Sequence, residues 1–81
     1  MPTEPEIYTA LGEIFADVFQ RPVSLNAGVT ARDVQGWDSF KQIEIIMATE
    51  ERFAIRFTTR ELDSLQSVGD LVRVISSKLP A

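Results

Sequence analysis

The sequence contains no cysteine and no histidine. The absence of cysteine excludes disulfide bonds, and without either residue type the usual zinc ligand sets are missing, so we expect no metal site. The most common general base of serine hydrolases is missing as well. Apolar packing must therefore supply most of the stability of the fold.

Long apolar runs and excess positive charge are also lacking. No apolar run approaches the length of a membrane-spanning helix, and the first residues lack the basic-then-apolar pattern of a secretory signal. The net charge of −4 argues against nucleic acid as a partner, because binding to phosphates depends on clustered lysine and arginine. We therefore expect a monomeric, cytoplasmic protein that is not an integral membrane protein.

A chain of 81 residues is long enough for one domain with a single small core. Four segments combine helix-start signals with apolar residues at spacings of three and four, and no segment alternates as a strand does. We expect a single domain, 1–81, that folds as an all-α four-helix bundle of three longer helices and a short third one. A long loop over 20–38 separates the first two helices, and its apolar residues are expected to anchor it to the core: Val23, Leu25, Val29 and Val34.

Capping residues place the first two helices. The first is expected to begin after the cap Thr3 and to reach about Phe19. The second is expected to begin at Ser39, whose spacing to Gln42 fits a capping box, and to reach Arg52 or Phe53.

Similar signals place the last two helices. A short third helix is expected over 58–64, with Leu62 and Leu65 packed against the bundle. The fourth begins at the cap Ser67 and ends at Pro80. Its inward-facing residues are predicted to be Val68, Leu71, Val72, Ile75 and Leu79.

The second predicted helix is apolar on more than one face. One stripe suits a core: Ile45, Ile46, Thr49 and Phe53. A second stripe mixes apolar and acidic side chains: Phe40, Ile43, Met47, Glu44, Glu50 and Glu51. A helix needs only one stripe for a core, so the second predicts a partly exposed contact surface, with burial of both stripes in the bundle as the alternative.

Ser39 is the candidate functional residue, because a turn at Gly36 delivers its hydroxyl to the start of a helix. A phosphate linked there would lie at the positive end of the helix macrodipole. The chain has no histidine to activate a nucleophilic serine, its Lys41 and Lys78 are poorly placed to replace one, and it lacks the Gly-x-Ser-x-Gly elbow, so we expect no enzymatic activity. Two interpretations of Ser39 remain, an attachment point modified by another enzyme or a simple helix cap. The neighbouring Asp38 is then either a second capping acid or a ligand for a metal ion that a modifying enzyme brings.

The segment Gly36-Trp37-Asp38-Ser39-Phe40 resembles the Gly-x-Asp-Ser-Leu motif of acyl carrier proteins and of the wider phosphopantetheine-carrier family. The similarity extends from Glu6 to Leu79 and includes the Ser67-Val68-Gly69-Asp70-Leu71 start of the last helix. The resemblance implies that a magnesium-dependent phosphopantetheinyl transferase attaches 4′-phosphopantetheine to Ser39, beside Asp38. It also implies that the thiol of this arm carries acyl groups as thioesters to acyl-loading, synthase or acyltransferase enzymes.

The resemblance further implies roles for particular side chains. The surface that partner enzymes read would be formed by Trp37, Asp38, Phe40, Ile43, Glu44, Met47, Glu50 and Glu51. The acyl chain would be lined by Ile46, Phe53 and Ile75. Trp37 has an alternative role as a cover over the loop and core.

Some positions depart from the family pattern. Phe40 replaces the usual leucine, and Trp37 precedes the acid where a smaller residue is common. Several bases neutralise a region that is acidic in general fatty-acid carriers: Lys41, Arg52, Arg56 and Arg60. We therefore expect a specialised, free-standing carrier. The alternatives are a peptidyl or amino-acyl carrier of a nonribosomal or D-alanylation pathway, and a helical protein-binding module that carries no arm.

Overall fold

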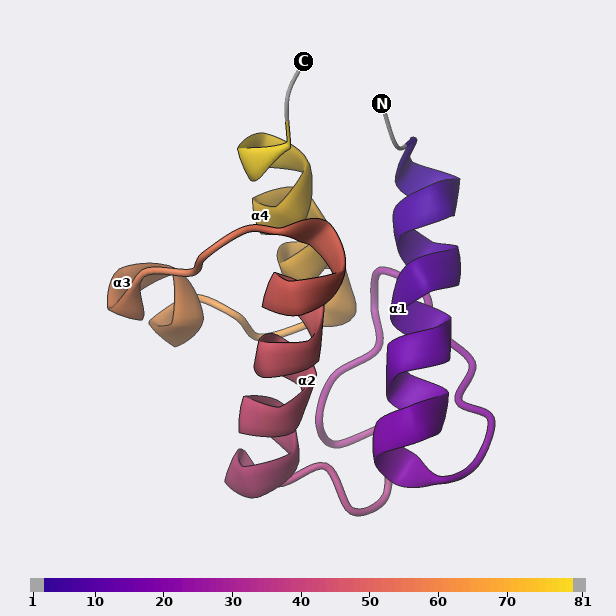
Figure 1. The fold of residues 1–81 in the computed structure, drawn as a ribbon. Coiled ribbons are helices and arrows are strands. Elements are labelled where there is room, and N and C mark those ends of the chain that lie inside the picture. The colour runs from indigo at the N-terminus through magenta and orange to yellow at the C-terminus, as the bar shows by residue number, and fades with distance from the viewer. Residues whose placement is uncertain (1–2, 80–81) are drawn as a thin grey trace.

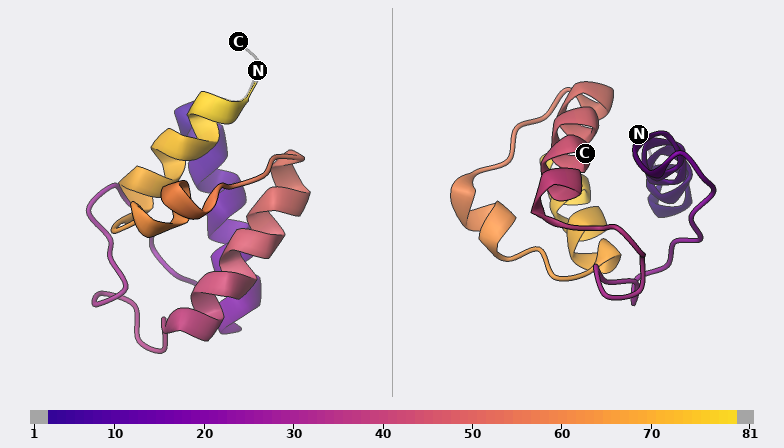
Figure 2. Two further views of the ribbon diagram at one scale, coloured as in Figure 1. Left: turned by 90° about the vertical axis from the view of Figure 1, so that its left-hand side faces the viewer. Right: turned by 90° about the horizontal axis from the view of Figure 1, so that it is seen from below.

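Four α-helices make up most of residues 3–79, the part of the chain that the computed structural model describes. They are α1 (Glu4–Phe19), α2 (Ser39–Phe53), α3 (Thr59–Asp63) and α4 (Val68–Lys78). Within these residues there is no strand, so the prediction of an all-α fold with a long loop after the first helix is confirmed. In Figure 1 and in the right-hand view of Figure 2, α1 and α2 lie side by side, and α3 lies apart from the other helices. No helix of this part of the chain is long and apolar enough to cross a membrane.

Side-chain caps define the starts of three helices as predicted. The Thr3 hydroxyl accepts a hydrogen bond from the backbone N–H of Glu6, and the Glu6 carboxylate accepts one from the N–H of Thr3 at 3.0 Å. Thr58 and Glu61 form the same reciprocal pair before α3. Ser67 caps α4. These bonds satisfy N–H groups that have no partner within the helix. The predicted stop at Pro80 lies outside the described residues.

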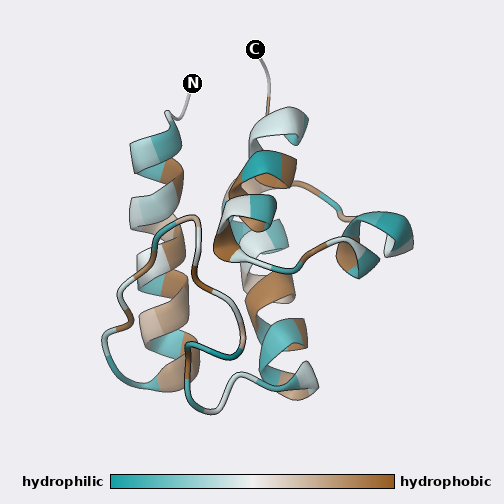
Figure 3. Cartoon of the chain, turned by 180° about the vertical axis from the view of Figure 1, so that it is seen from behind, coloured by the Kyte–Doolittle hydropathy of each residue, from teal (hydrophilic) through white to brown (hydrophobic). Residues whose placement is uncertain are grey.

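The core lies where the apolar faces of α1, α2 and α4 meet. Its buried apolar side chains are Ile7, Ala10, Leu11, Ile14, Phe15, Val29, Val34, Ile45, Ile46, Val68, Leu71, Val72 and Ile75. Figure 3 shows the hydrophobic side of α1 turned toward the other helices. Thr49 is also buried, and its hydroxyl donates to the carbonyl oxygen of Ile45 at 2.7 Å, so its polar group remains satisfied. The first predicted stripe of α2 is thus the core stripe.

The loop over 20–38 is attached to the start of α4. The backbone N–H of Val68 donates to the carbonyl oxygen of Val29 at 2.8 Å, and that of Gly69 donates to the carbonyl oxygen of Ala27 at 3.1 Å. A Cβ atom at Gly69 would lie 2.8 Å from the same Ala27 oxygen, so a side chain at this position would push the loop away. The predicted apolar anchors of the loop are buried or half-buried: Val23, Leu25, Val29 and Val34.

α3 itself contributes no residue to the buried core. None of its five residues is buried, and Leu62 is 37% exposed although it was predicted to pack against the bundle. A helix of little more than one turn has too few positions to bury a face, and Leu62 borders a groove. Leu65, just beyond the helix, is half-buried against the core as predicted. The ammonium of Lys78 lies 2.8 Å from the Glu61 carboxylate and ties α3 to α4.

Candidate functional site

A tight turn positions the start of α2. Gly36 has φ +86°, a left-handed conformation that glycine adopts without steric cost. Backbone hydrogen bonds close the turn, from the N–H of Trp37 to the carbonyl oxygen of Val34 and from the N–H of Asp38 to that of Gly36. The turn leaves Asp38 extended and Ser39 as the first helical residue.

Asp38, and not Ser39, caps α2. A carboxylate oxygen of Asp38 accepts a hydrogen bond from the backbone N–H of Lys41 at 2.9 Å. The prediction that Ser39 caps the helix is therefore wrong, and the alternative of a capping acid is confirmed. Both residue types are good caps, and the turn decides between them by placing Asp38 in the extended conformation that a cap requires. Ser39 is exposed, and its hydroxyl makes no hydrogen bond within residues 3–79.

Trp37 covers one end of the core. Its ring lies edge-on to that of Phe15, with centroids 5.1 Å apart, and it also contacts Phe19. The indole Nε1 donates to the side-chain Oε1 of Gln42 at 2.8 Å. Gln42 thus bonds Trp37 instead of completing the predicted capping box. The contacts of Trp37 match its alternative role as a cover.

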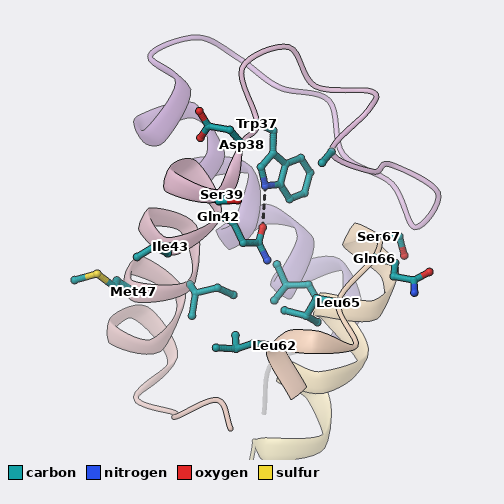
Figure 4. A pocket seen from close by; sticks show the side chains of 13 residues that line it. Trp37, Asp38, Ser39, Gln42, Ile43, Met47, Leu62, Leu65, Gln66 and Ser67 are labelled. Carbon is teal, nitrogen blue, oxygen red and sulfur yellow. Dashed lines mark hydrogen bonds between the residues drawn. The ribbon is translucent and has the colours of Figure 1, made fainter. Parts of the chain in front are cut away.

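A groove of about 640 Å³ opens beside Ser39, between the first half of α2, the α3 segment and the start of α4 (Figure 4). Ser39 and Gln42 border it, and its apolar walls include Ile46, Leu62 and Leu65. Among the three predicted lining residues, the groove contains Ile46. It reaches neither Phe53, at the far end of α2, nor Ile75, which is fully buried in the core.

The second stripe of α2 is largely exposed, as predicted. The side chains of Phe40, Ile43 and Met47 are 69%, 59% and 62% exposed, so burial of both stripes in the bundle is excluded. In Figure 4, Met47 projects away from the bundle. An apolar surface of this kind on a small protein is typical of a contact site.

The acidic residues of this stripe differ in their surroundings. Glu51 is exposed, and Glu44 lies 3.6 Å from the ammonium of Lys41. The carboxylate of Glu50 accepts a hydrogen bond from the backbone N–H of Phe57 at 2.9 Å, so it holds the connection to α3. Glu50 therefore has a structural role that its position in the stripe did not indicate.

Two of the four bases near α2 make contacts with α1. Arg52 pairs with Glu13 at 2.8 Å, and the Lys41 ammonium donates to the carbonyl oxygen of Val18 at 3.2 Å. Arg56 and Arg60 are exposed. The positive charge of Arg52 is thus directed to α1 and away from the exposed stripe.

The pKa of Glu61, on α3, is shifted. Its bond to the Lys78 ammonium, and after it the hydrogen bond from the backbone N–H of Thr58, hold the pKa of the Glu61 carboxyl below its ordinary value. Between residues 3 and 79, no group of three or more acidic side chains is arranged to hold a metal ion.

Comparisons with known proteins agree on one family. The family model described as "Phosphopantetheine attachment site" matches residues 9–75. The chain is 32% identical to an acyl carrier protein of Acidothermus cellulolyticus, covering 93% of this chain and 90% of the relative. It is 31% identical to acyl carrier protein 3 of Ralstonia nicotianae, covering 95% and 90%.

A solved structure shows the same fold. The solution structure of a holo acyl carrier protein from Geobacter metallireducens superposes with a TM-score of 0.84 at 34% identity, covering 96% of this chain and 86% of that one. The chain therefore belongs to the acyl carrier protein family of phosphopantetheine-binding carriers, and it serves as a carrier of covalently bound 4′-phosphopantetheine rather than as an enzyme.

Proposed function

We propose that Ser39 is the residue that carries the 4′-phosphopantetheine, and that the protein presents acyl groups to biosynthetic enzymes of the fatty-acid, lipid or polyketide type. The observation that carries this proposal is the position of Ser39 at the first turn of α2, exposed and bordering an apolar groove. When bound, the group supplies a flexible chain ending in a thiol, which holds the acyl group as a thioester.

The start of α2 suits a phosphodiester. The backbone N–H groups of Ser39 and Phe40 lie in the first turn, where no carbonyl of the helix can accept from them. Together with the helix macrodipole they favour a negative group at this end. The negative charge of the Asp38 carboxylate opposes a phosphodiester there, but one carboxylate oxygen accepts a hydrogen bond from the backbone N–H of Lys41. Its charge is thus partly compensated within the helix.

The groove supplies apolar surface within reach of Ser39. Its volume lies within the range of pockets that hold small molecules, roughly 300–1,000 Å³. We propose that the acyl group contacts Ile46, Leu62 and Leu65 there. Contact with Phe53 or Ile75, the other two predicted lining residues, would require the helices to separate.

The exposed stripe of α2 is the proposed surface for partner enzymes, including the phosphopantetheinyl transferase. Phe40, Ile43 and Met47 would supply the apolar centre, and Glu44 and Glu51 a charged rim. Phe40 is the most exposed of the three apolar residues and lies next to Ser39. Such a bulky group beside the attachment point supports a specialised carrier with partners of its own.

Intact mass spectrometry tests the attachment site. The wild type, Ser39→Ala and a control, Ser24→Ala, are co-expressed with a broad phosphopantetheinyl transferase. Ser24 is an exposed serine of the 20–38 loop, outside α2. We expect one added arm on the wild type and on Ser24→Ala, and none on Ser39→Ala. An arm on Ser39→Ala, or an unmodified wild type beside a modified carrier control, would contradict the proposal.

The capping geometry allows Ser39→Ala to remove the attachment site without removing the helix cap. Because Asp38 provides the cap, Ser39→Ala should change the free energy of unfolding by no more than about 0.5 kcal/mol, whereas Asp38→Ala should cost about 0.5–2 kcal/mol. Thermal melts of the unmodified proteins would show the difference. The acid released from the native protein by mild hydrolysis then identifies the cargo, and an amino acid would indicate a peptidyl or amino-acyl carrier.

A further inference from the structure

Gln42 places a polar group at the border of the groove. It lies one helical turn after Ser39 and is half-buried. An indole Nε1–H can only donate, so the Gln42 atom 2.8 Å from Trp37 Nε1 must be the carbonyl oxygen of the amide. The NH₂ end of the amide therefore points the other way, toward Leu65 and the groove, as Figure 4 shows.

The NH₂ group of Gln42 is available to donate hydrogen bonds. Among residues 3–79, Gln42 Nε2 donates to no protein acceptor, and the groove beside it is lined by apolar side chains, Ile46 on the same helix and Leu65 beyond α3. Trp37 is itself held edge-on to Phe15, so the orientation of the amide is set before any ligand arrives. A donor that is already oriented loses little conformational entropy when it binds an acceptor.

We propose that Gln42 is a positioning residue that donates from Nε2 to an amide carbonyl oxygen of the 4′-phosphopantetheine arm and so directs the arm into the groove. The inference depends on the proposed attachment at Ser39. Gln42 would contact the arm rather than the acyl group because it lies one helical turn from Ser39. Side chains at that spacing are only about 5–6 Å apart at Cβ, so the first part of the arm is within reach. The thioester end of the arm would have to fold back to reach Gln42.

The side-chain NH₂ signals of the ¹⁵N-labelled protein provide the first test. We expect the Gln42 signal to shift when the unmodified protein is converted to the form bearing the arm, and its protons to show NOEs to the arm. The Gln35 side chain, exposed in the 20–38 loop and absent from the groove lining, is the internal control and should not shift. A shift that appears only after an acyl group is loaded would assign the contact to the cargo and overturn the proposal.

Two variants test the Gln42 donor separately from the stability of the fold. Gln42→Glu keeps an acceptor for Trp37 Nε1 but loses the donor, and Gln42→Met lacks the donor without adding charge. Both should still gain the arm by intact mass and show the melting behaviour of a folded domain. NOEs between the arm and Leu65 should fall in both, reporting a roughly two- to tenfold decrease in the docked population.

A third variant tests the orienting contact. Trp37→Phe keeps an aromatic ring against Phe15 but removes the Nε1 donor, so we expect a smaller loss of the same NOEs. Unchanged arm NOEs in both Gln42 variants would overturn the inference while leaving attachment at Ser39 intact. Absence of the arm from the wild type would show by mass that the proposed attachment itself is wrong.

Discussion

Two regions of the molecule differ in how completely their side chains are buried: the frame of α1, α2 and α4, and the segment 54–66 that contains α3. In the frame, side chains such as Phe15, Ile45 and Ile75 are completely buried. In the segment 54–66, no residue is fully buried. Its half-buried side chains Ile55, Phe57 and Leu65 pack against the core, and the Glu61–Lys78 pair and the Glu50–Phe57 hydrogen bond add polar contacts. The groove lies between them. One of its walls is thus fixed by complete apolar burial, and the other by partial burial and by polar contacts that water can replace, so the second wall should open at lower free energy.

The largest expected difference is between Phe15→Ala and Leu62→Ala. Phe15 is fully buried in the frame, so its truncation should cost about 3–5 kcal/mol of unfolding free energy. Leu62 is 37% exposed on α3, and its truncation should cost less than about 1 kcal/mol. Urea unfolding followed by circular dichroism measures both, with Ile45→Val as a milder frame variant. Similar costs for Phe15→Ala and Leu62→Ala would show that the α3 segment is as firmly packed as the frame.

A smaller effect is expected where the 20–38 loop meets α4. Gly69→Ala places a Cβ within 2.8 Å of the Ala27 carbonyl oxygen and should cost about 1–3 kcal/mol. Gly12, inside α1, has nothing within 4 Å of an added Cβ, so Gly12→Ala should stabilise the protein by about 0.5–1 kcal/mol. Thermal and urea unfolding of the two variants should thus move in opposite directions. A neutral Gly69→Ala would mean that the loop is not held firmly against the start of α4.

The smallest effect concerns the polar attachment of α3. Because the folded-state pKa of Glu61 is lowered, the stability that it contributes is present above the ordinary glutamate pKa and is lost as the pH falls through the folded-state pKa. Lys78→Met should remove most of this pH dependence. Amide hydrogen exchange should accelerate at residues 58–65, while exchange in the frame and the melting temperature change little. Equal acceleration in α1 would indicate that α3 unfolds only together with the frame.

Local signals explain which predictions were confirmed. The capping boxes at Thr3 and Thr58 join residues three apart, and the apolar period of each helix is also a local property. The start of α2 was predicted at the right residue, but with the wrong cap, because Asp38 and Ser39 are adjacent and either side chain can cap. Only the turn at Gly36 distinguishes them.

Non-local contacts explain what the sequence left undecided. Leu62 was expected to pack against the bundle and instead borders the groove, whereas Ile75, predicted to line an acyl chain between the helices, is fully buried and does not border the groove. Glu50 was assigned to the exposed stripe, yet its carboxylate accepts a hydrogen bond from the backbone N–H of Phe57, seven residues later. The bond between Trp37 and Gln42 had no sequence signal, because a capping box is the ordinary expectation for a glutamine at that spacing.

The sequence by itself determined the four helices, the exposed stripe of α2 and Ser39 as the residue at its start, because hydrogen-bonded caps and helical periodicity act over a few neighbouring residues. The tertiary structure decided which acid or hydroxyl caps α2, where the groove runs and which way the amide of Gln42 points. Those features depend on how the helices and the 20–38 loop are placed against one another, and residues distant along the chain set that placement through the core.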